Sequence, residues 1–94
     1  MVEKFHEELK KLKKEVVEMG DLAKEMLSNA VEALKDRNKE VASQVIEKKK
    51  KIADMDERIE QDALRLIALY QPMARDMRTI ACVLKMITYL TRVG

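Results

Sequence analysis

The sequence has very little of several residue types: one cysteine, one proline, two glycines, no tryptophan, and only 3% aromatic residues among 94. A single cysteine, Cys82, allows no internal disulfide and no cysteine-based zinc site, so a reducing cytoplasm is the expected location. The shortage of glycine and proline excludes collagen-like and proline-rich chains. It also disfavours an all-β fold, because sheets need turn residues and strands rich in aromatic or β-branched residues.

Long hydrophobic runs and an excess of one charge are missing as well. The longest uncharged run, residues 66–74, has nine residues, half of what a membrane-spanning helix needs, so no membrane insertion is expected. The first eleven residues are too densely charged for a secretory signal. The net charge of +2 is too small to drive nucleic-acid binding.

What the sequence does contain is charge, at 38%, interleaved with apolar residues at helical spacing. Three such stripes predict helices at about 4–35, 39–70 and 73–93, separated by turn-forming residues near Asp36–Asn38 and by Gln71–Pro72. Short connections make neighbouring helices antiparallel. We therefore predict an all-α fold: one domain over residues 1–94, an up-down-up bundle of three long helices.

The stripes also predict which residues form the core. The expected positions are Phe5, Leu9, Leu12, Val16, Met19, Ala23, Met26, Ala30 and Ala33; Val41, Val45, Ile52, Met55, Ile59, Ala63, Leu66 and Tyr70; and Met73, Met77, Ile80, Leu84 and Ile87. Residues 71–94 carry only five charges, so this segment is expected to be the most buried. Cys82 is accordingly expected to be an inert buried thiol.

Residues that could carry out catalysis are scarce. The only histidine, His6, has no neighbouring cysteine or second histidine, and its expected state is a solvated side chain near the N-terminus. The two serines, Ser28 and Ser43, lie outside any Gly-x-Ser-x-Gly motif, and two isolated glycines cannot form a phosphate-binding loop. We therefore expect that the protein has no catalytic residues and is not an enzyme.

A run of four lysines interrupts the second stripe. Because four consecutive positions point to all sides of a helix, one of Lys48, Lys49, Lys50 and Lys51 must lie toward the core and extend its ammonium group outward. Solvated helix surface is the ordinary interpretation of such a run. The functional interpretation is that these lysines, together with Arg58, present a basic strip on the solvent side of the second helix, which an acidic partner could bind.

One segment is more distinctive than helical periodicity requires. Residues 63–78 read ALRLIALYQPMARDMR, which closely resembles the signature of the PhoU family of phosphate-signalling regulators, approximately L-x-L-I-A-L-Q-Q-P-x-A-x-D-L-R. The likeness is specific at Gln71, Pro72, Ala74, Asp76 and Arg78, and it extends over essentially the whole chain. In physical terms the signature is interpreted as a structural corner: Pro72 restarts the helix, Ala74 permits close backbone approach, and Asp76 favours the new N-terminus. Arg75 and Arg78 are expected to pair with carboxylates nearby.

The resemblance implies a function. PhoU-like proteins contain two three-helix repeats, of which this chain matches about one, with its third helix cut short at Gly94. Family members attenuate phosphate uptake and phosphate-starvation signalling by contacting the ABC transporter for phosphate and, in bacteria, its sensor kinase. The resemblance therefore implies a non-catalytic regulator that binds the transporter ATPase or a related signalling protein. The alternative is a structural helical-bundle module for oligomerisation with no phosphate-specific role.

The resemblance also implies a metal cluster, held by Glu/Asp-x-x-x-Asp motifs on the second and third helices, but the residues depart from the motif. Lys49 and Ala53 occupy the acidic positions of the second helix, and residues 89–94 read YLTRVG where the family has acids. We therefore expect no metal and no cofactor.

One repeat alone is expected to leave apolar residues uncovered. Val17, Leu27, Val31 and Leu34 lie off the main stripe of the first helix, and Val83, Met86 and Leu90 lie off that of the third. A chain with such surface is expected to form a homodimer about a two-fold axis.

Overall fold

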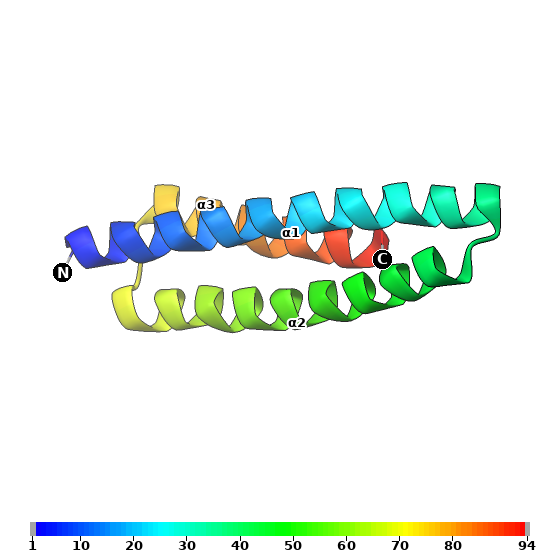
Figure 1. The fold of residues 1–94 in the computed structure, drawn as a ribbon. Helices are drawn as coiled ribbons and strands as arrows, with labels where there is room; N and C mark the ends of the chain where they lie inside the picture. Colours follow the sequence, from blue (N-terminus) through cyan, green and yellow to red (C-terminus); the bar gives the residue numbers. More distant parts are fainter. Residues whose placement is uncertain (1, 94) are drawn as a thin grey trace.

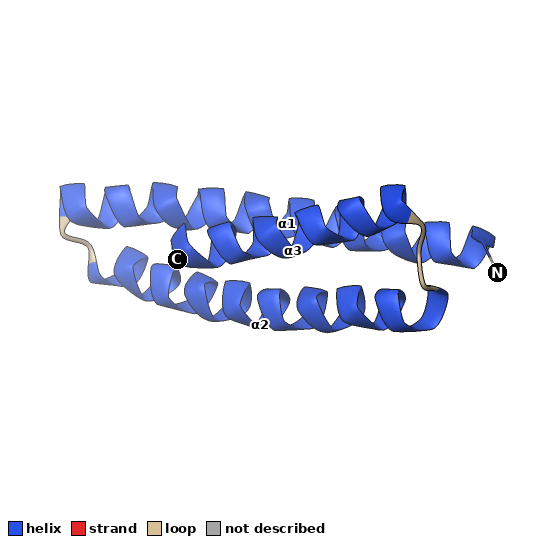
Figure 2. Cartoon of the chain, turned by 180° about the vertical axis from the view of Figure 1, so that it is seen from behind, coloured by secondary structure: helices blue, strands red, loops and turns tan. Residues whose placement is uncertain are grey.

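The computed structural model describes residues 2–93, with side-chain surroundings given for residues 3–92. Three helices follow one another: α1 (Val2–Asp36), α2 (Lys39–Tyr70) and α3 (Ala74–Val93). They run up, down and up in a rod whose Cα atoms span 52 × 16 × 16 Å (Figure 1, Figure 2). No strand occurs among the described residues, which confirms the prediction of an all-α bundle.

Local chemistry explains where the helices end. Arg37 takes a positive φ of 51°, which turns the chain after α1. The carboxamide oxygen of Asn38 accepts a hydrogen bond from the Glu40 N–H at 3.0 Å, as an N-cap residue does at the start of α2. At the other end of α2, Gln71 has φ 42° and donates its N–H to the Ile67 carbonyl at 3.1 Å. This left-handed C-cap ends the helix.

The core is one apolar seam per helix. In α1 every expected residue from Phe5 to Met26 is buried, and Ala30 and Ala33 are half-buried. In α2 the buried residues are Val41, Ile52, Ile59, Ala63 and Leu66, while Val45, Met55 and Tyr70 are half-buried. Most of the core predicted for the first two helices is therefore correct.

The seam of α3 differs from the prediction. Its buried residues are Ile80, Val83 and Ile87, with Leu84 and Leu90 packed against the core. Met73, expected in the core, is 80% exposed, and Val83, expected outside it, is buried. Because α3 is apolar on several sides, periodicity did not identify the side that packs.

The expectation that residues 71–94 form the most buried segment is also wrong. Only three side chains of α3 are fully buried, against seven in α1, because α3 contacts the bundle along one side. Cys82 is exposed, which corrects its interpretation as a buried thiol.

Within residues 2–93, α3 ends before it reaches the connection between α1 and α2, so the described part of that end, the two-helix end, is formed by α1 and α2 (Figure 1). Four large apolar side chains of this two-helix end are exposed: Leu27, Val31, Leu34 and Ile46. Three of the four exposed large apolar side chains of α1 therefore lie at the two-helix end.

Candidate functional site

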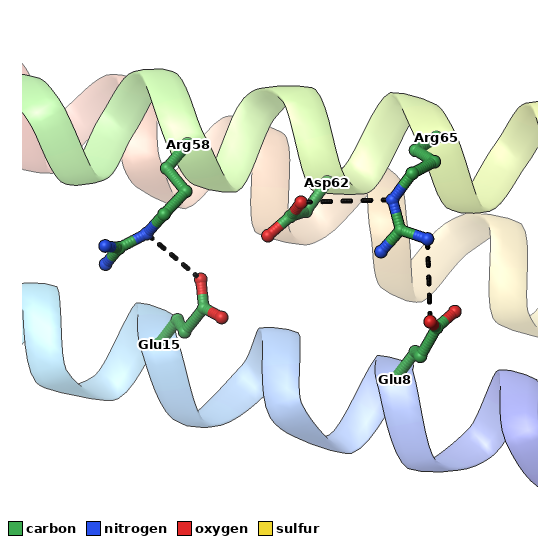
Figure 3. A network of polar contacts seen from close by, with 5 residues as sticks. All are labelled: Glu8, Glu15, Arg58, Asp62 and Arg65. Atoms are coloured by element: carbon green, nitrogen blue, oxygen red, sulfur yellow. Dashed lines mark hydrogen bonds and ion pairs between the residues drawn. The ribbon is translucent and has the colours of Figure 1, made fainter.

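A network of charged side chains joins α1 to α2 (Figure 3). Arg65 of α2 donates to the carboxylate of Glu8 at 3.5 Å and lies 4.0 Å from that of Asp62. Farther along, Arg58 Nε lies 3.8 Å from Glu15 Oε2. The carboxylates of α1 lie one position before a buried residue, Leu9 or Val16, so they reach across the edge of the seam to α2.

Burial distinguishes this network from ordinary surface pairs. The Glu15 side chain is 13% exposed, and one oxygen each of Glu8 and Glu15 is buried without a hydrogen bond. Removing a carboxylate from water is unfavourable unless a cation faces it, so Arg58 and Arg65 must stay opposite these residues. The network therefore favours one alignment of α2 along α1. The network consists of carboxylates that alternate with guanidinium groups, and none of its members is a nucleophile or a histidine.

Lys48 takes part in a separate contact between the same helices. Its ammonium group donates to the Asn29 carboxamide and lies 3.9 Å from Glu25 of α1. Its side chain is 24% exposed. This is the lysine that the sequence required to lie toward the core.

The five predicted partner-binding residues do not form a single strip. Lys48 and Arg58 pair with carboxylates of α1, whereas Lys49, Lys50 and Lys51 are exposed. At about 100° per residue these three lysines point to different sides of α2. The expectation of one solvent-facing strip that includes Lys48 and Arg58 is therefore wrong in its geometry.

The signature residues form the corner between α2 and α3. Gln71 supplies the left-handed cap, Pro72 follows it, and Ala74 begins α3. Ala74 is exposed, so the interpretation that it permits close backbone approach is wrong. Asp76 pairs with His6 of α1, with Oδ2 and Nε2 3.8 Å apart, instead of with Arg75 or Arg78.

A shallow apolar pocket of about 330 Å³ opens at this corner. Its lining comes from all three helices and the connection: Phe5, His6, Leu69, Tyr70, Gln71, Pro72, Met73 and Asp76. The Phe5 and Tyr70 rings are tilted against each other with centroids 5.2 Å apart. The corner therefore holds the start of α1 against the α2–α3 connection.

The phenol of Tyr70 is the titratable group that this corner perturbs. Burial raises its pKa above the ordinary 10.0, the nearby Glu8 carboxylate raises it further, and Arg65 partly opposes both. In the Tyr89→Phe variant Tyr70 is the only tyrosine left, because the chain has two. We expect phenolate absorbance in this variant to rise with a midpoint above pH 10.0.

The folded state holds this proton more tightly than the unfolded chain does. The stability that depends on it is therefore complete below pH 10.0 and declines as the pH rises through the folded-state pKa. Adding Glu8→Gln to the Tyr89→Phe variant should lower the midpoint, since a neutral amide repels phenolate less. A midpoint at 10.0 in both variants, with helical circular dichroism intact, would contradict the Glu8–Tyr70 coupling.

The residues present do not fit the metal cluster that the resemblance implies. Lys49 and Ala53, at the positions of the acidic motif, are both exposed on α2 and offer no carboxylate. Within residues 2–93, no three side chains of His, Cys, Asp or Glu are grouped so that they could hold a metal ion.

Comparison with known protein families identifies the family of this chain. The PhoU domain matches residues 16–94, which include more than half of α1 and all of α2 and α3. The chain belongs to the PhoU family. The resemblance seen in residues 63–78 is thereby confirmed.

Similar curated proteins cover the chain almost completely. The phosphate-specific transport system accessory protein PhoU of Serratia marcescens is 34% identical over 96% of the chain and 37% of its own length. A PhoU homolog of Aquifex aeolicus is 38% identical over 97% of the chain and 41% of its own length, and Escherichia coli PhoU is 33% identical over 96% and 37%. The chain thus spans about two fifths of these relatives. No solved structure matches it at a significant level.

Sequence reasoning missed the contacts that close the corner. His6 is exposed, as expected, but its contact with Asp76 was not foreseen, and Tyr70 was assigned only to the seam. The available signal was the position of each residue: His6 and Asp76 fall at the first turns of α1 and α3, which the up-down-up topology places at the same end of the bundle. The network of Glu8, Glu15, Arg58 and Arg65 had a similar signal, because each residue directly precedes a core position.

Proposed function

We propose that this protein is a non-catalytic regulator of phosphate uptake that acts in the cytoplasm by contacting the phosphate transport machinery. The observation that carries the proposal is its match, over almost its whole length, to proteins named phosphate-specific transport system accessory proteins. Among the described residues no helix is long and apolar enough to cross a membrane. A protein of this kind would reach a transporter through its ATPase or a related signalling protein.

The side chains of this protein are better suited to binding a partner than to catalysis. The half-buried carboxylates of Glu8 and Glu15 face arginines, and His6 faces Asp76, so the described titratable clusters hold helices together. Exposed cations, by contrast, are available to a partner. Of the residues predicted to bind one, Lys49, Lys50 and Lys51 retain this role in the proposal because they are exposed.

The test is a binding assay with the cognate phosphate-transporter ATPase, purified, at low and moderate salt. Replacing Lys49, Lys50 and Lys51 with Glu should weaken binding at low salt by about tenfold and reduce its salt dependence. Unchanged affinity and salt dependence would remove these three lysines from the contact. No binding by the unmodified protein would contradict the adaptor function and leave the alternative, a structural module for oligomerisation.

We also propose that the protein forms a homodimer through the two-helix end. Leu27, Val31, Leu34 and Ile46 are exposed there, and Leu34 is 82% exposed. Apolar side chains gathered beyond the reach of α3 favour pairing with a second copy about a two-fold axis. Light scattering at tens of micromolar should give twice the chain mass, and Val31→Glu with Leu34→Glu should return it to one. A monomeric unmodified protein would contradict the dimer.

A further inference from the structure

The two long sides of α1 have different neighbours. Residues one position before its seam, Glu8, Glu15 and Glu25, pair with cations of α2. His6, one position after the seam, pairs with Asp76 of α3. Positions one after the seam therefore lie on the α3 side of α1. Those that follow His6 at helical spacing are Lys10, Lys13, Val17, Gly20 and Lys24.

The sides of α3 can be assigned in the same way. Leu84 and Thr88, just after the buried Val83 and Ile87, line a hollow together with Asp56 and Glu60 of α2. Positions just before the buried residues therefore lie on the α1 side of α3. These are half-buried Thr79 and exposed Cys82 and Met86. Arg75 and Tyr89 follow the same helical spacing, and Arg78 and Lys85 lie beside them toward solvent.

Together these positions make one outer face across α1 and α3, which we call the basic face. It consists of Lys10, Lys13, Lys24, Arg75, Arg78 and Lys85 around a centre of Val17, Cys82, Met86 and Tyr89. All ten side chains are exposed, and none of the six cations forms an ion pair among the residues that the structure describes. Exposed Asp21, one helical turn from both Val17 and Lys24, is an acid at its edge, so the six cations remain in excess. The single acid of α3, Asp76, is paired with His6.

We propose that the basic face is a docking surface for an acidic amphipathic helix of another protein. The two parallel helices, α1 and α3, form its sides, and a third helix along them would place its apolar stripe against Val17, Met86 and Tyr89. Its flanking carboxylates would meet lysines of α1 on one side and Arg78 and Lys85 of α3 on the other. Methionine and tyrosine are typical of the centres of protein interfaces.

Charge complementarity selects this occupant. A second copy would bring six like charges against six, which repels, so the homodimer must use another surface. A membrane is disfavoured because the face has no Leu, Ile, Phe or Trp to insert, and a few cations without such residues bind lipid weakly. The inference does not rest on the proposed role in phosphate transport, because it concerns the chemistry of the partner and not its identity.

The test uses a synthetic helical peptide of about 20 residues, which spans about 30 Å, with a leucine stripe flanked by glutamates. We expect it to bind the whole protein at low salt, and a peptide of the same composition in scrambled order to bind at least about tenfold more weakly. The variant Lys13→Glu, Arg78→Glu, Lys85→Glu should weaken binding about tenfold or more. Lys4→Glu, Lys35→Glu, Lys39→Glu is the matched control, since it changes the net charge equally at exposed positions outside the basic face, and it should change affinity less than about twofold.

Cys82 supplies a second readout because it is the only cysteine and lies at the centre of the face. Saturating peptide should slow modification of Cys82 by a maleimide about tenfold, whereas the scrambled peptide should not. Equal weakening by the two triple variants, or binding without protection of Cys82, would overturn the proposal. So would anionic phospholipid vesicles that bind more tightly than the peptide and protect Cys82. Failure of the ATPase assay with peptide binding intact would affect only the proposed role in phosphate transport.

Discussion

Replacing Ile59 with alanine is expected to lower the free energy of unfolding by about 2–5 kcal/mol. Ile59 is 0% exposed and belongs to the core cluster to which all three helices contribute. Removing three carbons there loses apolar burial and leaves a cavity that rigid neighbouring helices fill only in part. Since small domains have about 5–15 kcal/mol of stability, this one change can remove much of it. Urea unfolding followed by circular dichroism measures the loss.

The matched control is Leu64→Ala, on the same helix and 53% exposed. It removes a similar number of carbons from a largely solvated position, so it should change stability by less than about 1 kcal/mol. If both variants lose the same stability, Ile59 does not lie in a three-helix core.

Enlarging Ala63 to leucine is expected to destabilise the protein by about 1–3 kcal/mol for the opposite reason. Ala63 is 0% exposed, so the structure holds no room for three further carbons. They would push α2 away from its neighbours or force side chains off their preferred rotamers. The same urea titration gives the magnitude, and the loss should be accompanied by a lower melting temperature.

Ala53→Leu is the control for this substitution. Ala53 is on the same helix but exposed, and leucine has nearly the helix propensity of alanine, so stability should stay within about 0.5 kcal/mol. A stable Ala63→Leu protein would show that α2 does not pack closely at this position.

The core of α1 could be predicted residue by residue because its apolar residues form only one stripe along the helix. Lysine and glutamate fill the other sides, so a single apolar seam from Phe5 to Met26 remains to be buried. In the N-terminal half of α3 and the connection before it, more than one side could have been the buried side. Apolar residues lie on several sides there, at Met73, Met77, Cys82 and Val83, and few charged residues mark a side as exposed. Packing chose Val83 and left Met73 and Cys82 exposed.

The candidate partner-binding residues show a similar limit. Sequence reasoning found cations in the lysine run, where they are adjacent in the chain. The exposed cations of the basic face, such as Lys13 on α1 and Lys85 on α3, are more than seventy positions apart in the sequence. Nothing in the local pattern links them, because each helix shows only its own balance of charge.

By itself the sequence determined the helices, their approximate ends, the antiparallel order and the family. These follow from periodicity, from Asn38 and Pro72 as local signals, and from the motif in residues 63–78, all of which act over a few neighbouring residues. Only the tertiary structure decided which side of α3 is buried and that Arg58 and Lys48 pair with carboxylates of α1. It also decided that lysines of α1 and cations of α3 share a face. The physical reason is that the rotation of each helix about its axis is set by packing against the other two, which no single helix encodes.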